Sequence, residues 1–269
     1  MDENIRGKIV EQNLTLHEIE APFYDSIHAE IFNKHEQARL SSVLRRVDSL
    51  VNHNTKKALD FGAGTGNVTM KLIDLGYDVT AIDLSAEMLE ILKKKHTSHF
   101  RDKQIVAIAG DIESIELPYE DFSVITAYSV LHHLPDYSKT IRKLASLLRK
   151  GGIMFIDHDP SPHLWDMSSV QTVISRVKIS CDYFLNKISR QKFIGQVDIP
   201  RFDYSWADYW CSKEHHLDHK LIQCTFKDLG FESANREDYY LNRTDFLNPI
   251  FPFYKAFCKP DVSLWIAKK

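Results

Sequence analysis

The 269-residue sequence predicts an α/β fold in which helices cover both faces of a mostly parallel sheet. Short apolar runs alternate with helical patterns from Lys56 onward, a glycine cluster follows the first run, and acidic residues follow three successive runs. With 43% hydrophobic and 26% charged residues, the composition is that of a globular protein. The net charge of -3, without a basic block, argues against a nucleic-acid partner and favours a small molecule.

The expected elements follow one another in a regular order. Residues from about 15 to 51 carry apolar side chains at spacings near three and four, which predicts helix. From there the pattern becomes that of β-α-β units with parallel pairing. We expect strands at 58–61, 79–82, 105–109, 122–127 and 153–156, and helices at 68–75, 85–95 and 137–149, the last closed by Gly151.

After residue 156 the alternation stops for about fifty residues. The segment from 160 to 215 contains nine aromatic residues and is too apolar for a solvated linker. A helix is then expected at about 213–229, followed by strands at 231–241 and 261–267. We therefore expect an N-terminal helical segment, 1–55, and one domain, 56–269, with an inserted cap at about 160–215.

Three of the ten glycines lie together at Gly62, Gly64 and Gly66. A strand that turns sharply into a helix beneath a ligand needs such residues, because they tolerate unusual dihedral angles and close approach. A dinucleotide fingerprint would require a further glycine at position 67 or 69, where the chain has Asn67 and Thr69. The sequence therefore predicts a ligand-binding loop that lacks the pyrophosphate fingerprint.

Acidic residues end three consecutive predicted strands. Asp60 precedes the glycines, Asp83 ends the next strand, and Asp111 follows the third. The carboxyl ends of parallel strands meet at one edge of the sheet, where open α/β folds bind ligands. Because an acid such as Asp83 can accept two ribose hydroxyls, we expect a nucleoside-like ligand that is not strongly anionic.

Taken together, these motifs resemble the class I S-adenosylmethionine-dependent methyltransferases, small-molecule branch. The matching segments are 59–67, 79–88 (VTAIDLSAEM), 110–112 and 122–136 (FSVITAYSVLHHLPD). The resemblance covers about residues 56 to 157, with weaker agreement in the last forty. It implies a Rossmann-like, seven-stranded sheet with an antiparallel last strand, an N-terminal helical lid, S-adenosylmethionine as cofactor and S-adenosylhomocysteine as product.

The resemblance also implies which residues hold the cofactor. Asp83 takes the ribose hydroxyls, Asp111 accepts from the adenine amine, and Tyr128 lies beside the methionine part. Asp60 either orients the glycine loop or reaches the cofactor's amino group. The complete implied set is Tyr24, Asp60, Gly62, Ala63, Gly64, Gly66, Asp83, Leu84, Met88, Asp111, Ile112 and Tyr128.

Methyl transfer is an in-line displacement with a good leaving group, so the protein mainly aligns the reactants and excludes water. An oxygen nucleophile would also need a base, for which His133 is the first candidate, followed by His132 and His158. Asp157 and Asp159 lie beside them in the sequence. These residues can equally serve only to shape their loops.

The acceptor is expected to be a small aromatic or apolar molecule. Trp165, Tyr209 and Trp210 of the cap can line its pocket, or can form a satellite core under a long excursion. No Asn-Pro-Pro-Tyr, Asp-Pro-Pro-Tyr or Pro-Cys motif follows the fourth strand. This absence, with the net charge, argues against DNA methylation.

No metal is predicted. Segments 157–159 and 215–219 are rich in ligand types, but no His-Glu-x-x-His motif or cysteine pair supports a site. The four cysteines are widely spaced, the N-terminus lacks an apolar signal core, and no apolar run is long enough to span a bilayer. We expect reduced thiols and a cytoplasmic protein.

Three alternative functions remain open. A nicotinamide-dependent oxidoreductase shares the acid after the second strand, but leaves Asp111 unexplained. A non-catalytic S-adenosylmethionine-binding module would not need the intact loop at 128–136. A peripheral membrane enzyme fits residues 170–188, where an apolar helix face can lie beside basic residues: Val173, Ile174, Val177 and Phe184 beside Arg176, Lys178 and Lys187. The oligomeric state is not predicted.

Overall fold

A computed structural model describes residues 2–51, 55–190, 206–212, 214–245 and 249–269, without the side chains of 186–190. Its described part contains a seven-stranded sheet in the order β3-β2-β1-β4-β5-β7-β6. The strands are β1 (Lys57–Phe61), β2 (Asp78–Asp83), β3 (Ile105–Ala109), β4 (Phe122–Tyr128), β5 (Leu148–Pro160), β6 (Ser233–Tyr239) and β7 (Val262–Lys268).

The pairing confirms the predicted sheet. Strands β1 to β5 pair in parallel, whereas β7 runs antiparallel to both β5 and β6. The fifth strand was predicted too short: β5 begins at Leu148, directly after helix α8 (Tyr137–Leu147). Gly151, expected to close that helix, lies inside β5, where its N–H donates to the carbonyl of Lys269.

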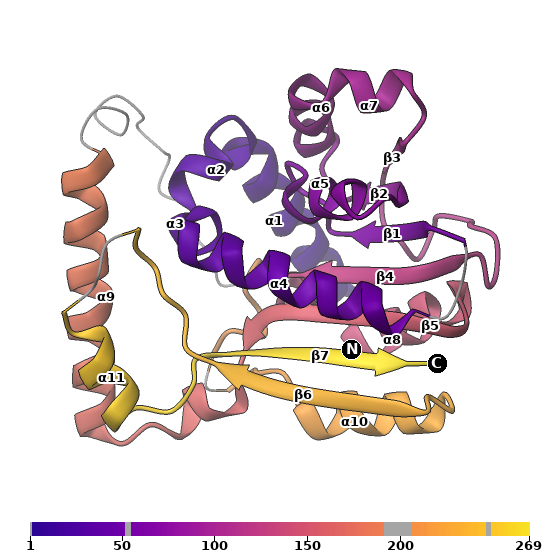
Figure 1. Cartoon of the computed structure of the whole chain (residues 1–269). Helices are drawn as coiled ribbons and strands as arrows, with labels where there is room; N and C mark the ends of the chain where they lie inside the picture. The colour runs from indigo at the N-terminus through magenta and orange to yellow at the C-terminus, as the bar shows by residue number, and fades with distance from the viewer. Residues whose placement is uncertain (1, 52–54, 191–205, 213, 246–248) are drawn as a thin grey trace.

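One helical layer covers each face of the sheet (Figure 1). Helices α4 (Lys34–Leu50), α5 (Asn67–Asp74) and α6 (Ala86–Lys95) share one buried cluster, and α8 and α10 (His219–Asp228) share the other. Strand β1 divides its side chains accordingly, because successive residues point to opposite faces. Ala58 joins the first cluster, whereas Leu59 and Phe61 join the second.

The segment from about 15 to 51 is helical as predicted, but it is divided among several helices. Helix α1 (Glu3–Glu20) begins much earlier, because Asp2 caps it by accepting from Asn4 N at 2.8 Å. The short pieces η1 (Ala21–Phe23), α2 (Tyr24–Ile27) and α3 (Ala29–Phe32) precede α4. Asn33 starts α4 by accepting from the N–H groups of His35 and Glu36 at 3.0 Å.

Helices α1 to α3, α9 (Ser169–Arg190) and α11 (Phe251–Phe257) gather beyond the end of the sheet toward which β1 points (Figure 1). The remaining short helices are α7 (Thr97–Arg101), η2 (Leu131–His133) and η3 (Pro162–Asp166). Part of the predicted cap, including Phe193, Phe202 and Tyr204, lies outside the described residues. Helix α11 was not predicted, since its seven residues are too few to show a helical period.

Candidate functional site

The glycine loop after β1 is shaped by steric demand. Gly62, Gly64 and Gly66 all have positive φ, at 71°, 52° and 99°. A Cβ on Gly62 would lie 2.2 Å from Val130 Cγ2, whereas a Cβ on Gly64 would meet no atom within 4 Å. The backbone at Gly64 is therefore open to a ligand, and the outer two glycines are required by packing.

Two buried acids hold this loop from different sides. Asp83 lies at the end of β2 and accepts from Gly64 N at 2.8 Å and from Ser85 N at 2.9 Å. Asp60 accepts from the hydroxyls of Thr69 at 2.6 Å and Thr126 at 2.8 Å. Burial raises the pKa of Asp60 to about 6, although these two hydrogen bonds oppose the shift.

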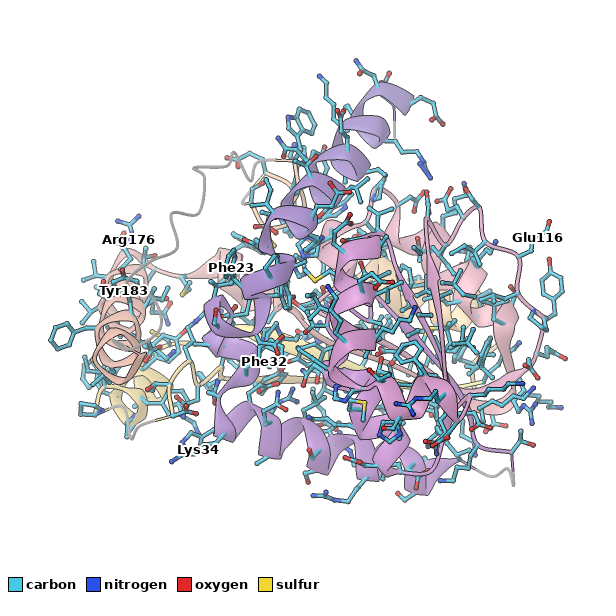
Figure 2. The ribbon with its side chains drawn as sticks, turned by 90° about the horizontal axis from the view of Figure 1, so that it is seen from above. Phe23, Phe32, Lys34, Glu116, Arg176 and Tyr183 are labelled. Carbon is cyan, nitrogen blue, oxygen red and sulfur yellow. The ribbon has the colours of Figure 1, made fainter. Side chains whose placement is uncertain are left out.

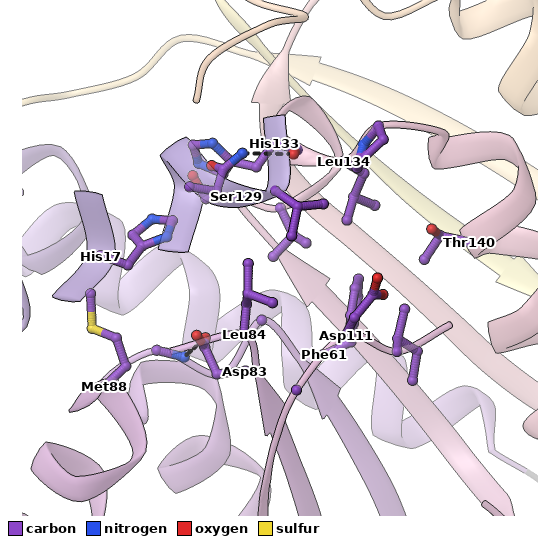
Figure 3. Close-up of a pocket in the computed structure, with 18 of the residues that line it drawn as sticks. His17, Phe61, Asp83, Leu84, Met88, Asp111, Ser129, His133, Leu134 and Thr140 are labelled. Carbon is purple, nitrogen blue, oxygen red and sulfur yellow. Dashed lines mark hydrogen bonds between the residues drawn. The ribbon is translucent and has the colours of Figure 1, made fainter. Parts of the chain in front are cut away.

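A first cavity of about 110 Å³ opens at the carboxyl ends of β1, β2, β3 and β4 (Figure 3). Nine of the twelve residues implied for the cofactor line it: Tyr24, Gly62, Gly64, Asp83, Leu84, Met88, Asp111, Ile112 and Tyr128. The other three do not. Asp60 lies behind the loop, Ala63 faces a smaller adjoining pocket, and Gly66 packs on Leu92.

Helix α1 supplies a wall of the first cavity that the sequence did not reveal. Arg6 Nη2 donates to Asp111 Oδ2 and to Glu113 Oε2, both at 2.9 Å. Asn13 Nδ2 donates to the carbonyls of Ile9 at 2.8 Å and His133 at 3.0 Å. Asn13 Oδ1 is buried without a hydrogen-bond partner among the described residues, so it is a free acceptor on the wall. The capping Asp2 was the available signal for this helix.

A second, larger cavity of about 370 Å³ adjoins the first. Four residues line both cavities: His17, Tyr24, Ser129 and His133. The remaining wall comes from distant segments, including α3, α9, α11 and the chain beside β6 and β7. It is unusually rich in charged groups: Glu20, His28, Glu30, Lys178, Asp208, Arg243 and Asp261.

Much of that charge is paired. His28 lies 2.7 Å from Glu30 Oε1 and 3.3 Å from Glu20 Oε2. Burial opposes the charged imidazole, but the hydrogen bonds to Glu20 and Glu30 raise the pKa of His28 to about 9. Lys178 Nζ contacts Asp182 Oδ2 and the Leu241 carbonyl, each at 3.0 Å. The second cavity is therefore bordered by one buried ion pair and by a half-buried histidine–carboxylate cluster.

The three candidate histidines stand in different environments. His133 Nδ1 lies 2.9 Å from the Ala207 carbonyl, and burial with two neighbouring histidines holds its pKa well below the usual range. Burial lowers the pKa of His158 to about 4, and its Nε2 has no hydrogen-bond partner among the described residues. Burial would also lower the pKa of His132, but Asp159, 2.7 Å from Nδ1, raises it.

The acids at the end of β5 are structural partners and line neither cavity. Asp157 accepts from Arg39 Nη2 at 2.7 Å and from the Tyr239 hydroxyl at 2.9 Å. Asp159 Oδ1 accepts from the His132 backbone and contacts His132 Nδ1 at 2.7 Å, while its Oδ2 is buried without a hydrogen-bond partner among the described residues. Direct contact between either acid and a substrate in these cavities is therefore not supported.

Of the three cap aromatics, only Trp165 lines the second cavity. Trp210 packs on the core, where its Nε1 donates to the Leu134 carbonyl at 2.7 Å. Tyr209 stacks on His215 with ring centroids 4.4 Å apart. Trp210 and Tyr209 therefore pack within the protein, in agreement with the alternative that they form a satellite core.

The histidine side chains of segment 215–219 do not point toward a common site. His219 Nε2 lies 2.9 Å from the Pro160 carbonyl, whereas His215 stacks on Tyr209. A different group, His132, His133 and Asp208, places one possible ligand atom each within 4.8 Å of one another. The absence of a metal stays a prediction.

Comparison with known proteins identifies the central part of the chain. Residues 59–156 match a family model described as a methyltransferase domain. Residues 59–156 are therefore similar to a methyltransferase domain, and the seven-stranded sheet around them has the class I methyltransferase topology. An uncharacterized methyltransferase of Anoxybacillus flavithermus is 36% identical over 137 residues, 50% of this chain and 58% of that protein. The match thus spans little more than half of that relative's length.

Solved structures confirm the fold of the chain around residues 59–156. The cyclase SpnF matches over 97% of this chain and 96% of its own, with a TM-score of 0.62 and 14% identity. A phosphoethanolamine N-methyltransferase of Haemonchus contortus, solved with S-adenosylhomocysteine, matches over 88% and 54%, with a TM-score of 0.55 and 15% identity. Because these two proteins carry different activities on one fold, the reaction has to be argued from the site.

No described helix combines the length and apolar character required to cross a bilayer. All four cysteines are unpaired, as expected.

Proposed function

We propose that this chain transfers a methyl group from S-adenosylmethionine to a small molecule held in the second cavity. The observation that carries the proposal is the adjoining pair of cavities with four shared wall residues. One cavity has the glycine loop and strand-end acids suited to a nucleoside, and the other offers separate space for an acceptor. A binding module without catalysis would have no use for the second space.

The residues of the first cavity fit the cofactor. The backbone of Gly64 is accessible to a ligand, and the Asp83 carboxylate can accept hydrogen bonds from ribose hydroxyls. Asp111 lines the same cavity and can accept a hydrogen bond from the adenine amine. Asn13 Oδ1 supplies a further acceptor for a cofactor N–H or hydroxyl. Asp60 orients the loop from behind, the first of its two expected roles. When bound, S-adenosylmethionine supplies the activated methyl group.

His133 is the proposed general base for an acceptor that must lose a proton. With Nδ1–H donating to the Ala207 carbonyl, its Nε2 carries a lone pair, and its lowered pKa keeps the ring neutral. It also lies on the wall that both cavities share. His158, neutral and with a free Nε2, is proposed to hold the acceptor through a hydrogen bond.

The second cavity favours an acceptor with a polar group over a purely apolar one. Trp165, Leu164 and Ile179 provide apolar surface, while His158 and the ion pairs provide hydrogen-bonding partners. A purely apolar molecule would leave such groups desolvated without compensation, which is costly. The expected aromatic or apolar acceptor is therefore narrowed to one that also carries a polar substituent.

Thermal unfolding with added sulfur nucleosides and with NAD tests the identity of the cofactor. A ligand at one hundred times its dissociation constant stabilises the folded state by about 2.7 kcal/mol, which raises Tm by several degrees. S-adenosylmethionine and S-adenosylhomocysteine should each produce this shift, and NAD should not. A larger Tm shift with NAD, or no shift with either sulfur nucleoside, would refute the proposal. A larger shift with NAD would favour the nicotinamide-dependent oxidoreductase instead.

Methyl transfer itself is tested with S-adenosylmethionine labelled in its methyl group and a panel of small acceptors that carry hydroxyl or amine groups. His133→Gln should lower kcat by about a hundredfold for a hydroxyl acceptor, in the range of general-base contributions, with little change in cofactor affinity. His158→Gln should mainly raise KM. Equal loss of cofactor binding in both variants would show that these histidines only maintain the fold.

A further inference from the structure

Helix α9 has its polarity reversed. The buried side chains in its described part are those of Ser175, Lys178 and Asp182. A helix of a globular protein normally buries its apolar stripe and exposes its charges. In α9 the buried charges are paired with each other at 3.0 Å, so the polar stripe is satisfied on the inner side.

The outer side of α9 and α11 is correspondingly apolar. Eight of the thirteen large hydrophobic side chains described as exposed lie on these two helices, each between 48% and 69% exposed. Seven of them form what we term the apolar face: Val170, Val173, Val177, Tyr183, Phe184, Phe253 and Phe257. The eighth, Ile179, lines the second cavity. Exposed apolar side chains gathered on two neighbouring helices indicate an interaction site.

The two helices form one unit. Gln171 Nε2 of α9 donates to the Phe257 carbonyl at 2.9 Å, and Lys178 Nζ lies 5.0 Å from the ring centroid of Tyr254. Figure 2 shows Tyr183 and Arg176 at the margin of the molecule, pointing away from the sheet. The inner side of the same unit walls the second cavity through Ser175, Lys178 and Tyr254.

The exposed charges on the two helices themselves have one sign. Among the described side chains of α9 and α11, the exposed charged ones are Arg176 and Lys255. A second copy of the chain, packed through a two-fold axis, would bring this patch against itself and oppose positive to positive. A surface of anionic lipid complements both the apolar side chains and the cations.

We propose that the apolar face of α9 and α11 binds the surface of membranes that contain anionic lipids, with Arg176 and Lys255 at the headgroups. Lys178, expected from the sequence to flank such a face, is instead buried in the ion pair with Asp182. The docked unit would place the second cavity next to the lipid. The inference does not depend on the proposed function, since lipid binding is measured without cofactor or acceptor.

Vesicle co-sedimentation of the purified full chain tests this inference. The chain should sediment with vesicles of phosphatidylcholine and phosphatidylglycerol, and much less with phosphatidylcholine alone. Val173→Ser with Phe184→Ser should lower the partition coefficient at least tenfold, because burying one large apolar side chain is worth about 1.5–3 kcal/mol. Arg176→Gln and Lys255→Gln should each lower it about fivefold, and added salt should remove that difference.

Leu221→Ser on α10 is the matched control, since it removes an exposed apolar side chain outside the apolar face. It should leave sedimentation unchanged, and circular dichroism should show that every variant is folded. Absence of binding to the mixed vesicles, or equal loss in Leu221→Ser, would overturn the inference. A dimer in light scattering that Val173→Ser with Phe184→Ser converts to monomer would overturn it too, by identifying a second copy as the partner.

Discussion

The two cavities of this protein are built in opposite ways. The first takes most of its wall from residues 61 to 140, at strand ends that follow one another along the chain. The second is assembled from α1, α3, α9, α11 and the segments around β6 and β7. Backbone geometry and single acids define the first cavity, whereas paired charged side chains define the second. A local motif thus marks the cofactor end, and long-range packing forms the acceptor end.

The largest expected effect concerns the ion pair that supports the second cavity. Lys178→Met should destabilise the fold by about 3–5 kcal/mol, because it leaves the buried Asp182 without its cation. Urea unfolding measures this loss. Lys178→Met with Asp182→Leu should recover most of the stability. A loss below about 1 kcal/mol in the single variant would show that the pair does not hold the wall.

The next effect concerns the first cavity. Asp83→Ala should raise the Kd for S-adenosylhomocysteine about a hundredfold, since hydrogen bonds to a charged group contribute about 1.5–3 kcal/mol each. Isothermal titration calorimetry measures this change. Trp165→Phe, on the second cavity, should leave the same Kd unaltered. Similar weakening in both variants would contradict the separation of the two cavities.

A smaller effect, on the free energy of unfolding, is expected for substitution in the glycine loop. Gly66→Ala places a Cβ 2.2 Å from Leu92 Cδ1 in the core, whereas Gly230→Ala meets no atom within 4 Å. Both glycines have positive φ, so each substitution carries the backbone strain of about 1–2 kcal/mol. Gly66→Ala should be the more destabilising by about 2 kcal/mol in urea unfolding, from overpacking. Equal values would mean that Leu92 moves without cost.

The smallest expected effect is a pH dependence at the second cavity. The pKa of His28 is raised from its ordinary value of 6.5 to about 9 by Glu20 and Glu30, so its protonated form stabilises the fold. The free energy of unfolding of the wild type should exceed that of His28→Gln by about 1 kcal/mol below pH 6.5. This difference should vanish as the pH rises through 9. Urea unfolding across that range measures it, and an advantage that grows with pH would contradict the assignment.

The sequence by itself determined the parallel strands, the glycine loop and the acids at one sheet edge. These features depend on local causes: alternation along a strand, the φ angles of Gly62, Gly64 and Gly66, and the rule that parallel strands end together. The resemblance to a known family added the antiparallel last strand. Nine of the twelve implied cofactor residues line the first cavity for the same reason.

Only the tertiary structure decided the rest. Asn13, which faces the first cavity, lies on helix α1. The apolar pattern of α1 is too weak to show where the helix begins, and only the capping residue Asp2 indicates its start. Reversed burial along α9 depends on Lys178 meeting Asp182 and the Leu241 carbonyl, 63 residues away. Asp157 likewise binds Arg39, which lies 118 residues away in the sequence, and this contact cannot be read from the residues around Asp157. Such contacts are selected by packing, which no local period in the sequence encodes.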